Sequence, residues 1–156
     1  MKEEKIEACG APAQSEAPVT VDQFLCFALY SASLAMTKLY QSRLKPLGLT
    51  YPQYLVLLVL WETQPLSVGD LGRRLYLDSG TLTPLLKRME QAGLVTRARD
   101  PLDERRVLIG LTPSGKAMKA KAAHVPTTLA AGRSVEDLDA LKDQVNALIR
   151  VLAPKG

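Results

Sequence analysis

The chain has 156 residues, of which 47% are hydrophobic and 23% charged, and its formal net charge is +4. This balance is ordinary for one globular domain, and no segment approaches the roughly 18 consecutive apolar residues that a membrane-spanning helix needs. With no signal-peptide pattern, one histidine and two cysteines, Cys9 and Cys26, the sequence predicts a cytoplasmic protein with no membrane segment, no structural disulfide, no metal site and no cofactor.

Residues 1–18 lack helical periodicity, so we expect a flexible tail followed by a single domain over residues 19–156. Further along, a Ser or Thr is repeatedly followed three residues later by a Gln or Asp. This is the spacing of a helix capping box, and each example stands just before an apolar run. The pairs are Thr20/Gln23, Thr50/Gln53, Ser67/Asp70 and Ser134/Asp137. They predict a mostly helical chain.

The first four helices are predicted over about 21–45, 51–62, 68–75 and 78–93. The first carries an apolar stripe at helical spacing, formed by Leu25, Leu29, Ala32, Met36 and Leu39. The second is apolar nearly all round, which is typical of a helix in the middle of a core. Pro46 and Gly48 are expected to end the first helix, and Gly93 the fourth.

The pattern changes after Gly93. Residues 94–99 and 105–111 are short runs with β-branched residues, and the stretch between them, 100–104, is rich in turn formers, which predicts a β-hairpin. Thr112 and Pro113 begin another helix that extends to about 124, and a last helix covers about 135–152. The predicted fold is mainly α with a small β-hairpin, arranged as a winged helix-turn-helix over about 51–111.

The second helix of a helix-turn-helix lies in the major groove of DNA and presents its first residues to the base edges. In the helix predicted near 79–92, the residues expected to face inward are Leu82, Leu85, Leu86 and Met89. The residues expected to contact DNA lie at its start or on its other face: Ser79, Gly80, Thr81, Thr83, Lys87 and Arg88. Pro84 conflicts with a regular helix, so the helix is either bent there or begins only near Thr83.

Arginines cluster on the predicted hairpin, at Arg97, Arg99, Arg105 and Arg106. An arginine at a wing tip can enter the minor groove of DNA; we expect Arg105 to do so, with Asp103 orienting the turn. A polar outer face is common on any amphipathic helix, and winged helices also bind proteins. A groove-sized helix beside a basic hairpin nevertheless favours double-stranded DNA as the partner, contacted by residues 67–111.

Residues 75–94, with the motifs DERR at 103–106 and LTPSG at 111–115, resemble the MarR family of bacterial regulators. The stretches 24–30 and 49–54 are similar to the organic-hydroperoxide-sensing (OhrR) repressors within that family. The resemblance covers nearly all of residues 20–152. It implies a homodimer, not an enzyme, that represses a peroxide-detoxifying gene, with helices 20–46 and 113–152 forming the dimerisation region. A two-fold dimer predicts a pseudopalindromic operator.

The resemblance also implies that Cys26 is the thiol that reacts with the organic hydroperoxide. Its supporting hydroxyls would come from Tyr30, Tyr40 and Tyr51, with at least one reaching across from the partner chain. Oxidation to sulfenic acid would be followed by capture by a second thiol or a backbone nitrogen. Cys9 is a possible resolving thiol, and a small cellular thiol is the other choice, because no cysteine stands near the start of the last helix.

Residue types alone give a different interpretation of Cys26, which apolar residues flank on both sides. Such a cysteine is usually a small core residue, no Lys, Arg or His lies within one turn, and Asp22 would oppose a thiolate. Two alternatives therefore remain: a MarR-type repressor released by a small aromatic ligand, and a thiol peroxidase. The peroxidase is disfavoured because no second catalytic constellation is present.

Overall fold

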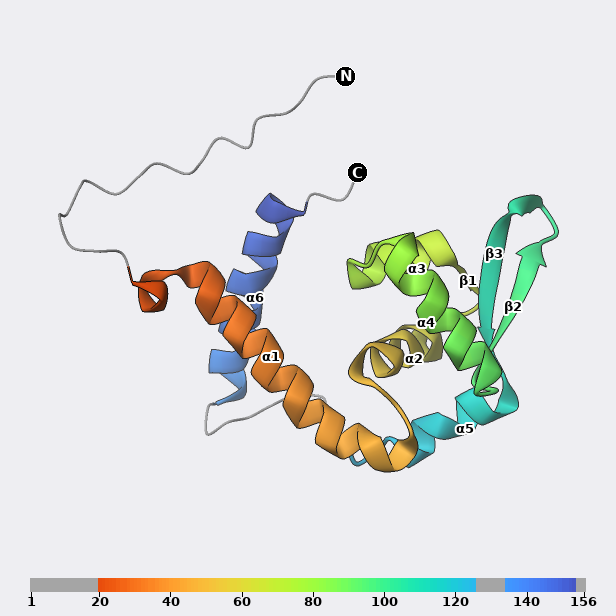
Figure 1. Cartoon of the computed structure of the whole chain (residues 1–156), viewed down its shortest axis with the longest axis horizontal. Helices are drawn as coiled ribbons and strands as arrows, with labels where there is room; N and C mark the ends of the chain where they lie inside the picture. The colour runs from red at the N-terminus through yellow and green to blue at the C-terminus, as the bar shows by residue number, and fades with distance from the viewer. Residues whose placement is uncertain (1–19, 126–133, 154–156) are drawn as a thin grey trace, which may run out of the picture. The chain divides into compact units, whose positions relative to one another are not determined.

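The computed structural model describes residues 20–125 and 134–153 (Figure 1). The chain divides into two compact units, residues 1–36 and 37–156. Helix α1 (Leu25–Leu44) begins in the first unit and ends in the second. The predicted tail and Cys9 lie outside the described residues.

The first helix starts later than the sequence predicted. Val21–Gln23 form a short 3₁₀ turn, and Phe24 has an extended backbone, with φ −85° and ψ 119°. The Gln23 side chain accepts a hydrogen bond from the Thr20 N–H at 3.4 Å, so the predicted capping pair closes this turn and not α1. The prediction of a helix from residue 21 was therefore wrong, and α1 begins at Leu25.

Helix α2 (Tyr51–Glu62) lies in the core of the second unit, as its apolar sequence predicted. Thr50 accepts from the Gln53 N–H and Gln53 accepts from the Thr50 N–H, so this capping box is complete. Around α2 pack buried side chains from the end of α1, from α3 (Val68–Leu75), α4 (Ser79–Gln91) and the sheet. The side chains with no exposed surface include Leu44, Val56, Leu57, Leu71, Leu82, Leu86, Met89 and Ile109.

The hairpin forms, and it belongs to a three-stranded antiparallel sheet in the order β1-β3-β2. Strands β2 (Val95–Asp100) and β3 (Asp103–Leu111) pair up to the contact of Asp100 with Asp103, so the turn is Pro101–Leu102, shorter than the predicted 100–104. The sequence missed β1 (Leu66–Ser67), which pairs with β3 through Leu66 and Ile109. Figure 1 shows the turn of the hairpin pointing away from α5.

Helix α4 runs unbroken over Pro84, whose ring lies on the exposed side. The suggestion that regular geometry begins only near Thr83 was therefore wrong, because the helix starts at Ser79 behind the Asp78 cap. A proline at this position removes the hydrogen bond that residue 84 would give to the Gly80 carbonyl.

Helix α5 (Pro113–Lys121) starts at the predicted cap, since the Thr112 hydroxyl accepts from the Gly115 N–H at 3.0 Å. It ends three residues earlier than expected. Helix α6 (Val135–Leu152) has the predicted bounds, and none of its side chains is buried in the described chain. Within residues 20–125 and 134–153, no helix has the length and apolar character that a membrane crossing requires.

Candidate nucleic-acid interface and thiol site

Helix α4 has the two faces that the sequence predicted. Leu82, Leu85, Leu86 and Met89 are buried. The residues expected to contact DNA are exposed: Ser79, Gly80, Thr81, Thr83, Lys87 and Arg88. The Asp78 carboxylate caps the helix by accepting from the Thr81 N–H at 2.8 Å and from its hydroxyl at 3.2 Å. These hydrogen bonds, the backbone one first, hold the pKa of Asp78 below its ordinary value.

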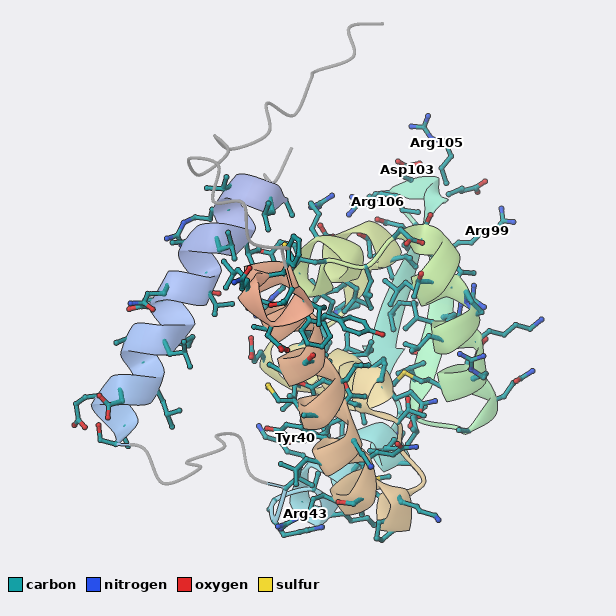
Figure 2. The ribbon with its side chains drawn as sticks, turned by 60° about the vertical axis from the view of Figure 1, so that its left-hand side comes forward. Tyr40, Arg43, Arg99, Asp103, Arg105 and Arg106 are labelled. Carbon is teal, nitrogen blue, oxygen red and sulfur yellow. The ribbon has the colours of Figure 1, made fainter. Side chains whose placement is uncertain are left out.

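The arginines of the hairpin lie at different depths. Arg105 stands near the turn with 91% of its side chain exposed, whereas Arg97 is half-buried at 26%. Figure 2 shows Arg105 and Arg106 beside Asp103 at the turn end of the hairpin. Asp103 accepts from both the N–H and the Nε–H of Arg105 at 3.1 Å, and the side-chain bond is the main cause that lowers the pKa of Asp103. This is the geometry expected of a residue that orients the turn.

A groove of about 680 Å³ joins α3, α4 and the hairpin. It brings together residues that lie far apart in the sequence: Ser67, Val68, Gly69, Arg73, Thr83, Arg97, Arg105, Arg106 and Val107. Lys87, Arg88 and Arg99 do not line it. Arg73 could not be predicted from the sequence, because it joins the hairpin arginines only when β3 packs beside α3. The groove thus gathers four guanidinium groups, the side-chain type that binds phosphate oxygens best, and each of the four also has a carboxylate partner.

Cys26 is the second residue of α1 and its side chain is exposed, as are those of Phe24, Phe27 and Tyr30 around it. Within this chain, Cys26 is therefore not the small core residue that its residue type and neighbours alone suggest. The first turn of a helix carries free N–H groups and the positive end of the helix dipole, which favour an anion such as a thiolate. Asp22 lies in the separate 3₁₀ turn and not in the same helix as Cys26.

The other two tyrosines predicted to support the thiol belong to the second unit. Tyr40 is buried and stacks on Tyr51 with ring centroids 4.7 Å apart, and Tyr54 lies 6.4 Å from Tyr40. Burial is the main cause that raises the pKa of Tyr51, so its hydroxyl keeps its proton and remains a hydrogen-bond donor near neutral pH. Among the described residues there is no group of three His, Cys, Asp or Glu side chains that would hold a metal ion.

The sequence model of the MarR family matches residues 49–107. The chain is 53% identical over 134 residues to the organic hydroperoxide resistance transcriptional regulator of Bacillus subtilis, covering 85% of this chain and 91% of that protein. It is 48% identical over 150 residues to the HTH-type transcriptional regulator TtmR of Methylorubrum extorquens, covering 90% of this chain and 77% of that protein. Among solved structures, the chain is similar to the overoxidized AbfR bound to DNA, and AbfR is a Staphylococcus epidermidis protein. The TM-score is 0.71 and the sequence identity 36%, and the match covers 82% of this chain and 91% of that chain.

Proposed function

The chain belongs to the MarR family of transcriptional regulators, and we propose that it is a DNA-binding repressor that senses organic hydroperoxides through Cys26 and then leaves its operator. The observation that carries the proposal is the position of an exposed thiol in the first turn of α1, in a chain similar to a regulator named for organic hydroperoxide resistance.

DNA binding is assigned to α4 and the hairpin. Helix α4 enters the major groove with its exposed polar face, which carries Thr83, Lys87 and Arg88. Arg105, the most exposed of the groove arginines, enters the adjacent minor groove at the tip of the hairpin. The exposed guanidinium group of Arg105 beside the groove supports this assignment, because such a group binds phosphate with paired hydrogen bonds. The AbfR structure, described as bound to DNA, supports it further.

The protein acts as a homodimer. Near the start of α1 the exposed large apolar side chains are Phe24, Leu25, Phe27, Tyr30 and Leu34, and on α6 they are Val135, Leu141, Val151 and Leu152. Exposed apolar surface of this extent is typical of protein interfaces. A two-fold dimer places its two α4 helices in successive major grooves, so the operator is a pseudopalindrome with half-sites about 10 bp apart.

The sensing step is a two-electron oxidation of Cys26. The thiolate sulfur attacks the outer oxygen of the hydroperoxide, the O–O bond breaks, and the alkoxide leaves and takes up a proton as the alcohol. The product is a sulfenic acid, which condenses with a second thiol to give a disulfide and water. The exposed aromatic and aliphatic neighbours of Cys26 favour an organic hydroperoxide over hydrogen peroxide as the oxidant. Tyr30, one turn further along α1, Tyr40 and Tyr51 supply hydroxyl donors to the thiolate, with at least one of them coming from the partner chain.

The proposal is tested by fluorescence anisotropy with a duplex that the wild-type protein selects from a random pool. Cumene hydroperoxide with cysteine present is expected to release the wild type, whereas Cys26→Ser still binds and is not released. Cys9→Ser serves as the matched control and is expected to behave as the wild type. A Cys26→Ser protein that still dissociates on peroxide treatment overturns the sensing role, and a wild type that binds no DNA overturns the proposal as a whole.

Samples from the same titration determine which thiol condenses with the sulfenic acid. Mass spectrometry of the oxidised wild type is expected to find cysteine attached to Cys26. If Cys9→Ser instead abolishes disulfide formation, then Cys9 is the resolving thiol. Release by a phenolic compound from a protein whose thiols are blocked would favour the ligand-released repressor.

A further inference from the structure

Asp70 on α3 lies at the centre of an ion-pair network that holds two of the arginines lining the groove. Its carboxylate contacts Arg73 one turn further along α3 and Arg106 of β3, the latter at 3.4 Å. Arg106 also approaches Asp100 of β2 at 3.9 Å. The network therefore ties α3 to both strands of the hairpin.

The sequence position of Asp70 fits a capping box, but its side chain is used differently. The Ser67 hydroxyl accepts from the Asp70 N–H at 3.1 Å and donates to the Asp70 carboxylate at 2.6 Å. The carboxylate is thus turned toward the arginines and held there by a nearly buried hydroxyl. The Ser67 hydrogen bond is the main cause that lowers the pKa of Asp70, so the side chain stays ionised in all neutral conditions.

Every arginine that lines the groove has a carboxylate partner. Arg97 pairs with Glu90 at 3.5 Å and Arg105 with Asp103 at 3.1 Å, and Asp70 serves both Arg73 and Arg106. By contrast, Lys87, Arg88 and Arg99 form no ion pair within the described part of the chain. Asp70 is distinguished from the other carboxylates because it restrains two cations from two different elements.

We propose that Asp70 is a positioning residue that determines the selectivity of the protein for its operator over unselected DNA. Asp70 keeps Arg73 and Arg106 from neutralising the phosphates of unselected DNA, and it also fixes the hairpin against α3. This inference rests on the proposed DNA binding. Affinity for unselected DNA comes almost entirely from cations that reach phosphates and displace counterions. Arginines held by a carboxylate of the same protein contribute less to that affinity, and the fixed hairpin retains the geometry that the operator requires.

The test is the salt dependence of DNA binding by wild type and Asp70→Asn, measured by anisotropy on the selected duplex and on an unselected duplex of equal length. Asparagine keeps the shape of the side chain and can still accept from the Ser67 hydroxyl. For unselected DNA, the affinity lost between 50 and 200 mM salt is expected to grow by about 3.5-fold for each arginine released. The ratio of affinities for selected and unselected DNA is expected to fall.

The matched control is Glu62→Gln. It makes the same change in charge and breaks an inter-helix ion pair, Glu62 with Arg74 at 2.6 Å, but Arg74 does not line the groove. It is expected to leave the salt dependence and the affinity ratio unchanged. Thermal unfolding of each variant shows whether a change in binding arises from loss of folded protein.

Arg106→Gln provides a second and independent test. Because Asp70 holds Arg106 in the wild type, removal of Arg106 from the wild type is expected to change the salt dependence little. Its removal from Asp70→Asn is expected to reverse the share of the gain that Arg106 contributes, whereas the share from Arg73 remains. The proposal is overturned if Asp70→Asn has the wild-type salt dependence and affinity ratio, or if Arg106→Gln alone lowers the salt dependence by a full phosphate contact. A wild type without salt-dependent binding refutes the proposed function instead.

Discussion

Gly115→Ala is predicted to be a severely destabilising substitution for its size. Gly115 is buried in the first turn of α5. A Cβ atom there would lie 2.0 Å from the Leu94 carbonyl oxygen and 3.1 Å from a methyl group of Leu111. The Cβ and the oxygen must separate by about 1.4 Å to reach 3.4 Å, where ordinary van der Waals contact begins. The backbone of either α5 or the start of β2 must move to allow this.

The energetic cost follows from the hydrogen bonds at this junction. The Leu94 carbonyl accepts from the Thr112 N–H and from its hydroxyl, each at 3.2 Å, and the Gly115 carbonyl accepts from Trp61 Nε1 at 3.0 Å. Overpacking in a filled core costs about 1–3 kcal/mol, and the weakened hydrogen bonds add about 1 kcal/mol. We therefore expect a loss of about 3 kcal/mol in the free energy of unfolding and, for a chain of this size, a Tm lower by about 10 °C.

The assay is thermal and urea unfolding followed by circular dichroism, at one fixed protein concentration because a dimer gains stability with concentration. Gly69→Ala is the matched control. A Cβ at Gly69, in the first turn of α3, meets no atom closer than 3.8 Å, so alanine is expected to be neutral or stabilising by up to about 1 kcal/mol. A Gly115→Ala protein that unfolds within about 0.5 kcal/mol of the wild type, a change typical of surface sites, would refute the reasoning.

Two further predictions concern the DNA-binding unit. Arg105→Ala removes the most exposed arginine of the groove. It is expected to weaken operator binding by about 1–3 kcal/mol without changing the Tm. Equal affinity of the variant and the wild type in the anisotropy assay would contradict the placement of Arg105 in the minor groove. The pKa of Asp78 is lowered in the folded chain from 3.8, so its charge stabilises the fold above pH 3.8, and this contribution is lost as the pH falls through the lowered pKa. The Tm difference between wild type and Asp78→Asn is therefore expected to be constant from pH 7 to about pH 4 and to shrink at lower pH. A Tm difference that stays constant down to about pH 2.5 would contradict this prediction.

Local signals in the sequence determined the helices of the second unit. The bounds of α2, α3 and α6 were predicted correctly because each starts at a cap whose partners are three residues apart, as Thr50 and Gln53 are in α2. The inward face of α4 was also predicted correctly, because a repeat of apolar residues every three or four positions specifies one side of a helix. Composition and these local rules were sufficient for the fold class.

The tertiary structure decided the features that join distant segments. Strand β1 has two residues and exists only because Leu66 meets Ile109 of β3; so short a segment carries no periodic pattern. The same holds for the groove, where Arg106 meets Asp70 across 36 positions of the chain. The sequence assigned Asp70 to a cap, since local spacing cannot tell whether a carboxylate bonds the backbone beside it or an arginine on another element. Hydrogen bonds between residues three positions apart can be predicted from the sequence. The pairing of charged residues on distant segments is determined only when the hairpin packs against α3.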